Sequence, residues 1–104
     1  MVEVVEVPAC EMSNADFNEA LSSIESKSFS DSRMTIAKQV ADNHCLTVKQ
    51  IKAIAGIFDF EDGKLEFAKY AYDACSEQNK YYLVNDVFNF ESSIDELQEY
   101  ISKR

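Results

Sequence analysis

Apolar side chains recur three or four residues apart along most of this chain, which is the spacing of one buried face of an amphipathic helix. Ser13 stands three residues before Asp16 in a capping-box-like arrangement, so we predict a first helix over about residues 14–26. Ser30 or Asp31 is placed to cap a second helix that ends near His44. The apolar faces of these two helices are Phe17, Ala20, Leu21 and Ile24, and then Met34, Ala37, Val40 and Ala41.

Four further helices are predicted from the same pattern. Their predicted starts are, in chain order, a capping box of Thr47 and Gln50, the turn Asp59 to Asp62, Ser76 or Asn79, and a capping box of Ser93 and Glu96. The fourth helix is apolar nearly all the way round, so neighbours must cover it from several sides. Its apolar residues are Leu65, Phe67, Ala68, Tyr70, Ala71 and Tyr72.

The segment that begins at Phe60 recurs in weaker form on both sides of itself. Phe29 begins a similar segment 31 residues earlier, and Phe90 begins another 30 residues later. A period of roughly 20 to 50 residues is typical of stacked supersecondary units. We therefore predict an all-α fold of three tandem helical hairpins, about six helices, stacked as a short right-handed α-solenoid-like bundle with helices 2, 4 and 6 side by side. Each phenylalanine is expected to act as a hydrophobic staple on the following helix rather than to stack on a ligand.

The predicted organisation is a single helical domain over residues 13–104. A chain of 104 residues has the length of one domain, and its 2 glycines and 1 proline are too few turn residues for an all-β fold. In residues 1–12 valines alternate with glutamates before Pro8, and we predict a linker or frayed N-terminal segment there, with a short edge strand as the alternative. No signal peptide is recognisable. The chain contains no run of roughly 18 apolar residues, so we predict no membrane insertion by this chain.

The charge distribution narrows the choice of partners. The net charge is −9, with seven acids against one base in residues 1–32, seven of each in 33–80, and five against two in 81–104. Nucleic acid requires clustered Lys and Arg, and an anionic membrane surface requires a basic patch, so neither is an expected partner. We expect a monomer that self-repulsion keeps apart from its copies.

Two metal sites can be tested against the sequence. An EF-hand loop with Gly63 at its sixth position would place Phe58, Phe60 and Lys69 where calcium needs oxygen ligands. A zinc site could combine Asp42, His44, Cys45 and Cys75 at one pole of the stack, but these residues lack the tight ligand spacing of structural zinc. We expect neither metal nor any other cofactor.

The three cysteines are predicted to share that pole. Cys10 could reach either Cys45 or Cys75 and form a disulfide in an oxidising compartment. For Cys45 and Cys75, however, the favoured interpretation is that of small buried hydrophobes. The only histidine, His44, adjoins Cys45, but adjacent side chains on a helix point about 100° apart and do not form a catalytic pair. We predict no catalytic residue and no enzyme activity.

Five tyrosines gather in the last two predicted hairpins. Five phenol hydroxyls are hard to bury together, so some of these side chains are expected at the surface, where tyrosine is favoured in contact patches. Tyr72 and Tyr82 are our candidate partner contacts. The alternative is that they are amphipathic residues at the rim of the core.

Taken together, several motifs resemble the bacterial family catalogued as domain of unknown function 4476, over about residues 10–101. They are Met12-Ser13 with Phe17; Phe29 with Arg33-Met34 and Ile36-Ala37-Lys38; Cys45 to Ile51; Phe58 with Phe60-Glu61; Leu65 with Phe67 to Tyr72; and Tyr81-Tyr82 with Val84, Asp86, Phe88 and Phe90. The resemblance implies a small helical unit with no established activity. It also implies the C-terminal part of a longer, exported protein, so the chain is expected to be an excised domain from the periplasm or cell envelope.

We therefore expect a non-catalytic binding or protein-interaction module with an unknown protein or envelope partner. A small enzyme domain that acts with a missing partner domain is one alternative, and a deep pocket of convergent polar groups would favour it. A passive structural spacer is the other, and a smooth surface without patches would favour that.

Overall fold

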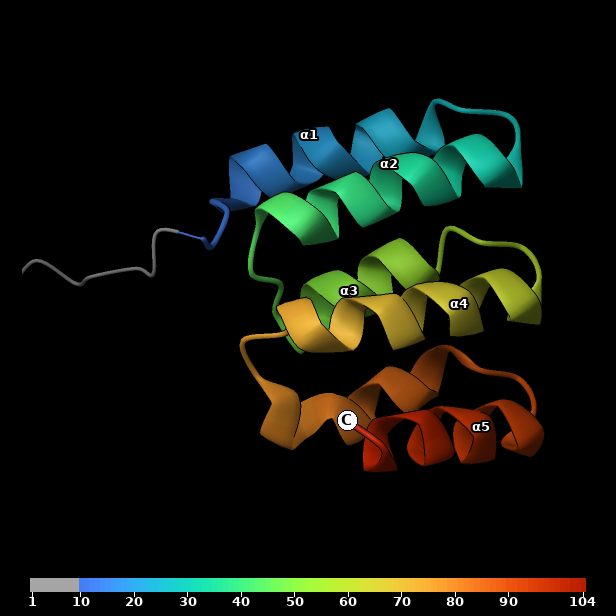
Figure 1. Ribbon diagram of the computed structural model, residues 1–104. Coiled ribbons are helices and arrows are strands. Elements are labelled where there is room, and N and C mark those ends of the chain that lie inside the picture. The colour runs from blue at the N-terminus through green and yellow to red at the C-terminus, as the bar shows by residue number, and fades with distance from the viewer. Residues whose placement is uncertain (1–9) are drawn as a thin grey trace, which may run out of the picture.

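The computed structural model describes residues 10–104, and in this part of the chain every regular element is a helix, so the predicted all-α class is confirmed. The α-helices are α1 (Asn14–Glu25), α2 (Ser30–Asn43), α3 (Val48–Ala55), α4 (Glu61–Ala71) and α5 (Glu91–Ser102), with two 3₁₀ helices, η1 (Tyr72–Ala74) and η2 (Gln78–Val87). Figure 1 shows three helical pairs stacked on one another, α1 with α2, α3 with α4, and η2 with α5.

The helix α4 lies at the centre of the stack and packs against α2, α3 and α5. Its buried residues Leu65, Phe67, Ala68 and Ala71 face these neighbours. The expectation that helices 2, 4 and 6 lie side by side is confirmed, and so is the multi-sided cover of the fourth helix. The right-handed solenoid-like course of the stack stays a prediction.

One hydrophobic cluster joins all three hairpins. Its largest fully buried side chains are Phe67, Ile24, Leu46, Ile51, Ile54, Leu97 and Val84. None of the described helices is both long and apolar enough to cross a bilayer. Residues 1–9 of the predicted N-terminal segment, with the alternative edge strand, lie outside the described residues. Cys10 is already part of the fold, since its carbonyl accepts a hydrogen bond from Cys45 N at 2.8 Å.

Helix starts follow two different designs. The capping predictions for the first helix of hairpins 1 and 2 are confirmed, because Ser13 Oγ accepts from Asp16 N at 3.1 Å and Thr47 forms a reciprocal capping box with Gln50. The helices α2, α4 and α5 instead take Phe29, Phe60 and Phe90 as N-caps, without a side-chain capping bond. The predicted caps Ser30 or Asp31, and the box of Ser93 with Glu96, are therefore wrong.

A carboxylate from the middle hairpin supplies the hydrogen-bond acceptor that α5 lacks at its N-terminus. Glu61, in the first turn of α4, accepts hydrogen bonds from Asn89 N at 3.0 Å, Phe90 N at 2.9 Å and Ser93 Oγ at 2.8 Å. Partial loss of water raises the pKa of Glu61, but the hydrogen bonds from Asn89, Ser93 and Phe90 outweigh this and hold it below its usual value. The glutamate thereby ties the second hairpin to the third.

The predicted fifth helix is a 3₁₀ helix that begins at Gln78, and its N-cap is Glu77 rather than Ser76 or Asn79. Its inward side chains Tyr81, Val84 and Val87 are three residues apart, which is the repeat of a 3₁₀ helix. The Tyr81 hydroxyl donates to the Ala68 carbonyl of α4 and anchors this face. Spacing by three thus explains why η2 is wound more tightly than an α-helix.

Candidate functional site

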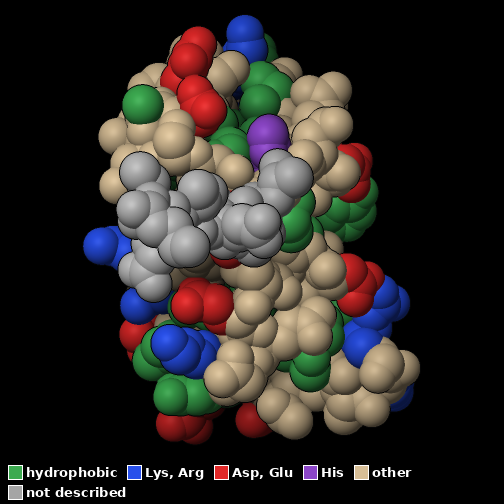
Figure 2. Space-filling view, turned by 90° about the vertical axis from the view of Figure 1, so that its left-hand side faces the viewer, with side chains coloured by type: hydrophobic (Ala, Val, Ile, Leu, Met, Phe, Trp, Pro, Cys, Tyr) green, Lys and Arg blue, Asp and Glu red, His purple; other side chains and the backbone are tan. Residues whose placement is uncertain are grey.

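The segments that lead into the three hairpins meet at one pole, which Figure 2 views directly. Cys10 and Cys45 form a disulfide there, with Cα atoms 4.9 Å apart. Leu46 N donates to Ala74 O and Ser76 N to Leu46 O, both at 2.9 Å, so Leu46 rather than Cys45 pairs with Cys75. Because successive side chains in extended backbone point to opposite sides, the Cys75 thiol is directed away from Cys45.

The pairing of Leu46 with Cys75 leaves Cys75 outside the disulfide. Cys75 is free and buried, and burial raises the pKa of its thiol, as expected for a small core hydrophobe. The same expectation for Cys45 is wrong, because Cys45 is the disulfide partner of Cys10. Within residues 10–104, no three His, Cys, Asp or Glu side chains converge as a metal site would require.

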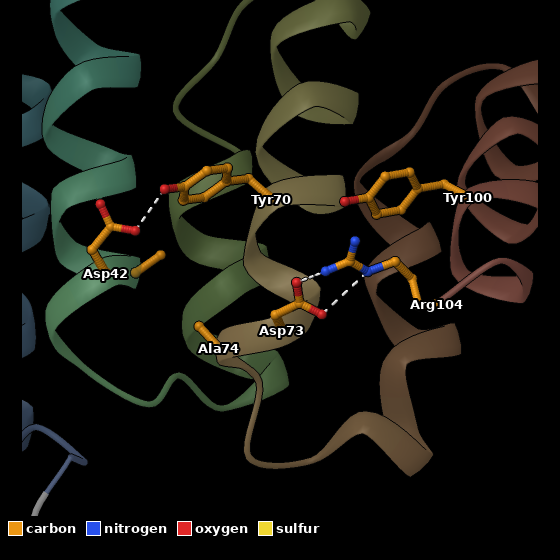
Figure 3. Close-up of a pocket in the computed structure, with 7 residues that line it drawn as sticks. Asp42, Tyr70, Asp73, Ala74, Tyr100 and Arg104 are labelled. Atoms are coloured by element: carbon orange, nitrogen blue, oxygen red, sulfur yellow. Dashed lines mark hydrogen bonds and ion pairs between the residues drawn. The ribbon is translucent and has the colours of Figure 1, made fainter.

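A polar hollow of about 480 Å³ lies on the face formed by α2, α4 and α5 (Figure 3). The Tyr70 hydroxyl donates to Asp42 Oδ1 at 2.6 Å. This hydrogen bond is the main reason why the pKa of the phenol is raised, and partial loss of water is the second. Arg104 pairs with Asp73, and its guanidinium carbon lies 5.4 Å from the centre of the Tyr100 ring. Asp42, Tyr70, Asp73 and Arg104 are each engaged with a partner from another hairpin, so these contacts tie the hairpins together.

Ion pairs continue the same role along this face. Lys38 contacts Glu66 at 2.8 Å between α2 and α4, and Lys69 contacts Glu96 at 2.7 Å between α4 and α5. These pairs are partly exposed, so each contributes little to stability. They do align the hairpins, which keeps the surfaces of the stack in fixed relative positions.

The predicted contact residues Tyr72 and Tyr82 come together in a second hollow, of about 160 Å³, at the end of the third hairpin. Tyr82 is 67% exposed, whereas Tyr72 is half-buried and meets the Tyr81 ring edge-on with centroids 4.9 Å apart. Tyr72 therefore belongs to the rim of the core and Tyr82 to the surface. That they contact a partner stays a prediction.

The most exposed large apolar side chains are the three N-cap phenylalanines, Phe29, Phe60 and Phe90, with exposed fractions of 76%, 74% and 61%. The loops that carry them lie together at the pole opposite the disulfide (Figure 1). Since α4 packs on both α2 and α5, and packed helices are about 8–10 Å apart, the loops that carry the rings follow one another at about that spacing. We call these three residues the phenylalanine row. The expectation of hydrophobic staples is wrong, because rings so exposed do not pack on a helix turn.

The sequence contains a signal that favours exposure of two of these rings. Each phenylalanine has polar neighbours on both sides, Ser28 and Ser30, Asp59 and Glu61, and Asn89 and Glu91. A residue of a buried face has apolar companions three or four positions away on the same helix. Phe29 and Phe60 lack that support in the helix that follows each of them, whereas Phe90 has Ile94 four positions later. The signal therefore favours exposure of the first two rings.

Comparison with known proteins adds a family but no function. No curated protein matches the chain, and no solved structure matches it. A family model described as a domain of unknown function, DUF4476, matches residues 11–101, a span that includes all three hairpins, the disulfide partner Cys45 and the phenylalanine row. The chain therefore belongs to the DUF4476 family.

Proposed function

We propose that this domain is a non-catalytic protein-interaction module and that the phenylalanine row is its contact surface. The observation that carries the proposal is the exposure of three large rings at equivalent positions of three hairpins. A phenylalanine buries about 150–250 Å² when it is covered, so the row offers roughly 400 Å² of aromatic surface. Exposed apolar surface of this kind supports an interaction site where its parts lie near one another, as the three loops do (Figure 1).

The charges around the row favour a basic protein partner. Asp31 lies two residues from Phe29, Asp62 two residues from Phe60, and Glu91 adjoins Phe90. A hollow of about 310 Å³ beside Phe60 also includes Asp31 and Asp62 in its lining. Lysine or arginine side chains would be attracted to these carboxylates.

The same hollow has an apolar part suited to the stem of such a side chain. Met34 and Phe58 line it together with Phe60, and the aliphatic stems of lysine and arginine pack on apolar surface while their charged ends stay at the carboxylates. A partner surface with apolar pockets flanked by basic residues therefore fits the row. A second copy of this acidic chain, or an anionic membrane, would be repelled.

The compartment we propose is outside the cytoplasm, in a bacterial envelope protein of which this is the C-terminal domain. The Cys10–Cys45 disulfide supports the proposal, because such bonds persist in oxidising compartments. The family resemblance supplies the bacterial and exported context. The domain is proposed to act there as a monomer that presents its row to another protein.

The test compares wild-type domain with a variant in which Phe29, Phe60 and Phe90 are all alanine. Both are used to capture proteins from an envelope extract, and the affinity of each recovered protein is then measured directly. We expect a partner whose affinity falls at least tenfold for the triple variant and also falls with rising salt. Leu83→Ala is the matched control, since it removes another exposed apolar side chain that belongs to neither surface and should leave the affinity unchanged.

Three results would overturn the proposal. Equal affinity of every recovered protein for wild type and triple variant would exclude the row as a protein-binding surface. Row-dependent flotation with zwitterionic lipid vesicles would identify a membrane instead, and a row-dependent dimer in analytical ultracentrifugation would identify a second copy. The unfolding midpoint of the triple variant, expected to equal that of wild type, checks that the fold is intact.

A further inference from the structure

The hollow that contains Tyr72 and Tyr82 differs from the other surface hollows in having no charged residue in its lining, as far as the described residues show. It lies between η2 and α5, which are both part of the third hairpin. Its polar side chains are four carboxamides and its apolar ones come from tyrosine, leucine and isoleucine. The lining residues are Tyr72, Gln78, Asn79, Tyr81, Tyr82, Asn85, Leu97, Gln98 and Ile101.

The carboxamides are available to a ligand. Within residues 10–104, the side chains of Asn79, Asn85 and Gln98 form no hydrogen bond to the protein. Gln78 uses its Nε2 to donate to Tyr72 O at 3.0 Å, which leaves its side-chain oxygen as an acceptor. Each free amide offers both donors and an acceptor at one place.

The aromatic wall is held in position from behind. Tyr72 is half-buried and packs edge-on against Tyr81. Tyr81 is itself fixed, because it is buried and its hydroxyl donates to the Ala68 carbonyl. Leu97, which is 1% exposed, closes the base of the hollow. The back wall of the site is therefore formed before any ligand arrives, which lowers the entropy cost of binding.

We infer that this hollow binds a neutral saccharide unit. A pyranose ring has apolar C–H faces that pack on a tyrosine ring, and its hydroxyl groups both donate and accept hydrogen bonds, as the carboxamides do. A charged ligand would find no counter-charge in the lining. A purely apolar ligand would form no hydrogen bonds with the carboxamides.

This inference does not depend on the proposed protein contact. The phenylalanine row lies on the loops at the pole opposite the disulfide, whereas the hollow is formed by η1, η2 and α5. The two surfaces share no residue. A variant of one surface can therefore be tested for binding at the other.

The experiment is an NMR titration of the ¹⁵N-labelled domain with glucose, N-acetylglucosamine and tri-N-acetylchitotriose, each to about 10 mM, a range that detects millimolar affinity. We expect shifts of η2 and α5 amides for at least one of these sugars. Tyr82→Ala and Asn85→Ala should each weaken the affinity at least tenfold. Gln39→Ala, which removes an exposed carboxamide on α2 outside the hollow, should leave it unchanged.

Other outcomes would overturn the assignment. Absence of saturable shifts with all three sugars would exclude a neutral saccharide site. A response to glucuronic acid as strong as that to the neutral sugars would contradict the lack of counter-charge, and tighter binding of a capped alanine–glycine peptide would identify a peptide site instead. Unchanged affinity in both Tyr82→Ala and Asn85→Ala would place the sugar elsewhere on the domain.

Discussion

Replacing Cys10 and Cys45 with serine opens a loop that the disulfide closes across a sequence separation of 35 residues. In the chain-entropy treatment, closing a loop of this length lowers the entropy of the unfolded chain enough to stabilise the fold by about 4 kcal/mol at 25 °C. The backbone hydrogen bond from Cys45 N to Cys10 O, at 2.8 Å, does not depend on the sulfur atoms. The expected loss is thus about 3–4 kcal/mol, a large share of the roughly 5–15 kcal/mol that stabilises a small domain.

The assay is urea unfolding, monitored by circular dichroism at 222 nm. Compared with oxidised wild type, reduced wild type and the Cys10→Ser/Cys45→Ser variant should show the same loss of unfolding free energy. In a thermal scan their melting temperatures should both be lower by roughly 15–30 °C. Reductant should not change the double variant further. Cys75→Ala is the control and should remain sensitive to reductant, because Cys75 is not in the disulfide.

Two results would refute this reasoning. A loss below about 1 kcal/mol in the double variant would show that loop closure is not what stabilises the fold. A Cys75→Ala variant that no longer responds to reductant would show that the bond joins different cysteines. Peptide mapping of the oxidised protein by mass spectrometry would then identify which two cysteines are joined.

Three further predictions follow from burial and hydrogen bonding. The pKa of Glu61 lies below its usual value of 4.5, so its stabilising contribution is present above that pH and is lost as the pH falls through the lower folded-state pKa. Glu61→Gln should therefore flatten the pH dependence of the unfolding free energy below about pH 5, and an unchanged pH dependence would contradict this reasoning. Phe67→Ala should lower the unfolding free energy by about 3–5 kcal/mol because the ring is fully buried. Phe60→Ala should change it by less than about 0.5 kcal/mol in the same urea titration, because that ring is exposed. Equal losses in the two variants would contradict the assigned exposures. The Cys75 thiol, buried and with a raised pKa, should react with a disulfide reagent only after unfolding, and rapid reaction in the folded protein would show that it is accessible.

The helical pattern was predictable because it depends on local chemistry. Thr47 and Gln50 satisfy each other's backbone groups within one turn, so their spacing alone identifies the start of α3. The repeat of Phe29, Phe60 and Phe90 likewise predicted three equivalent units, and hence the central position of α4. These features involve residues that are close in sequence or related by the repeat.

The phenylalanine row was misjudged for a physical reason. A ring at a turn can fold back on the next helix or face solvent, and the sequence spacing is the same in both cases. The start of α5 was misjudged because Glu61, 29 residues before Phe90, supplies the acceptor that a local cap would have provided. Such partners come from another hairpin, so no local pattern reports them.

By itself the sequence determined the helical class, the threefold repeat and the positions of most helices, because periodic burial and local capping are encoded within a few turns of chain. Only the tertiary structure decided that Cys10 pairs with Cys45, that Cys75 lies beside Leu46 in the core, and that Tyr72 and Tyr82 share one hollow with four carboxamides. The hollow depends on how η2 lies against α5, and the two cysteine outcomes depend on register between segments about 30 residues apart. A shift of one residue in extended backbone exchanges the inward and outward side chains, and composition and periodicity do not specify that shift.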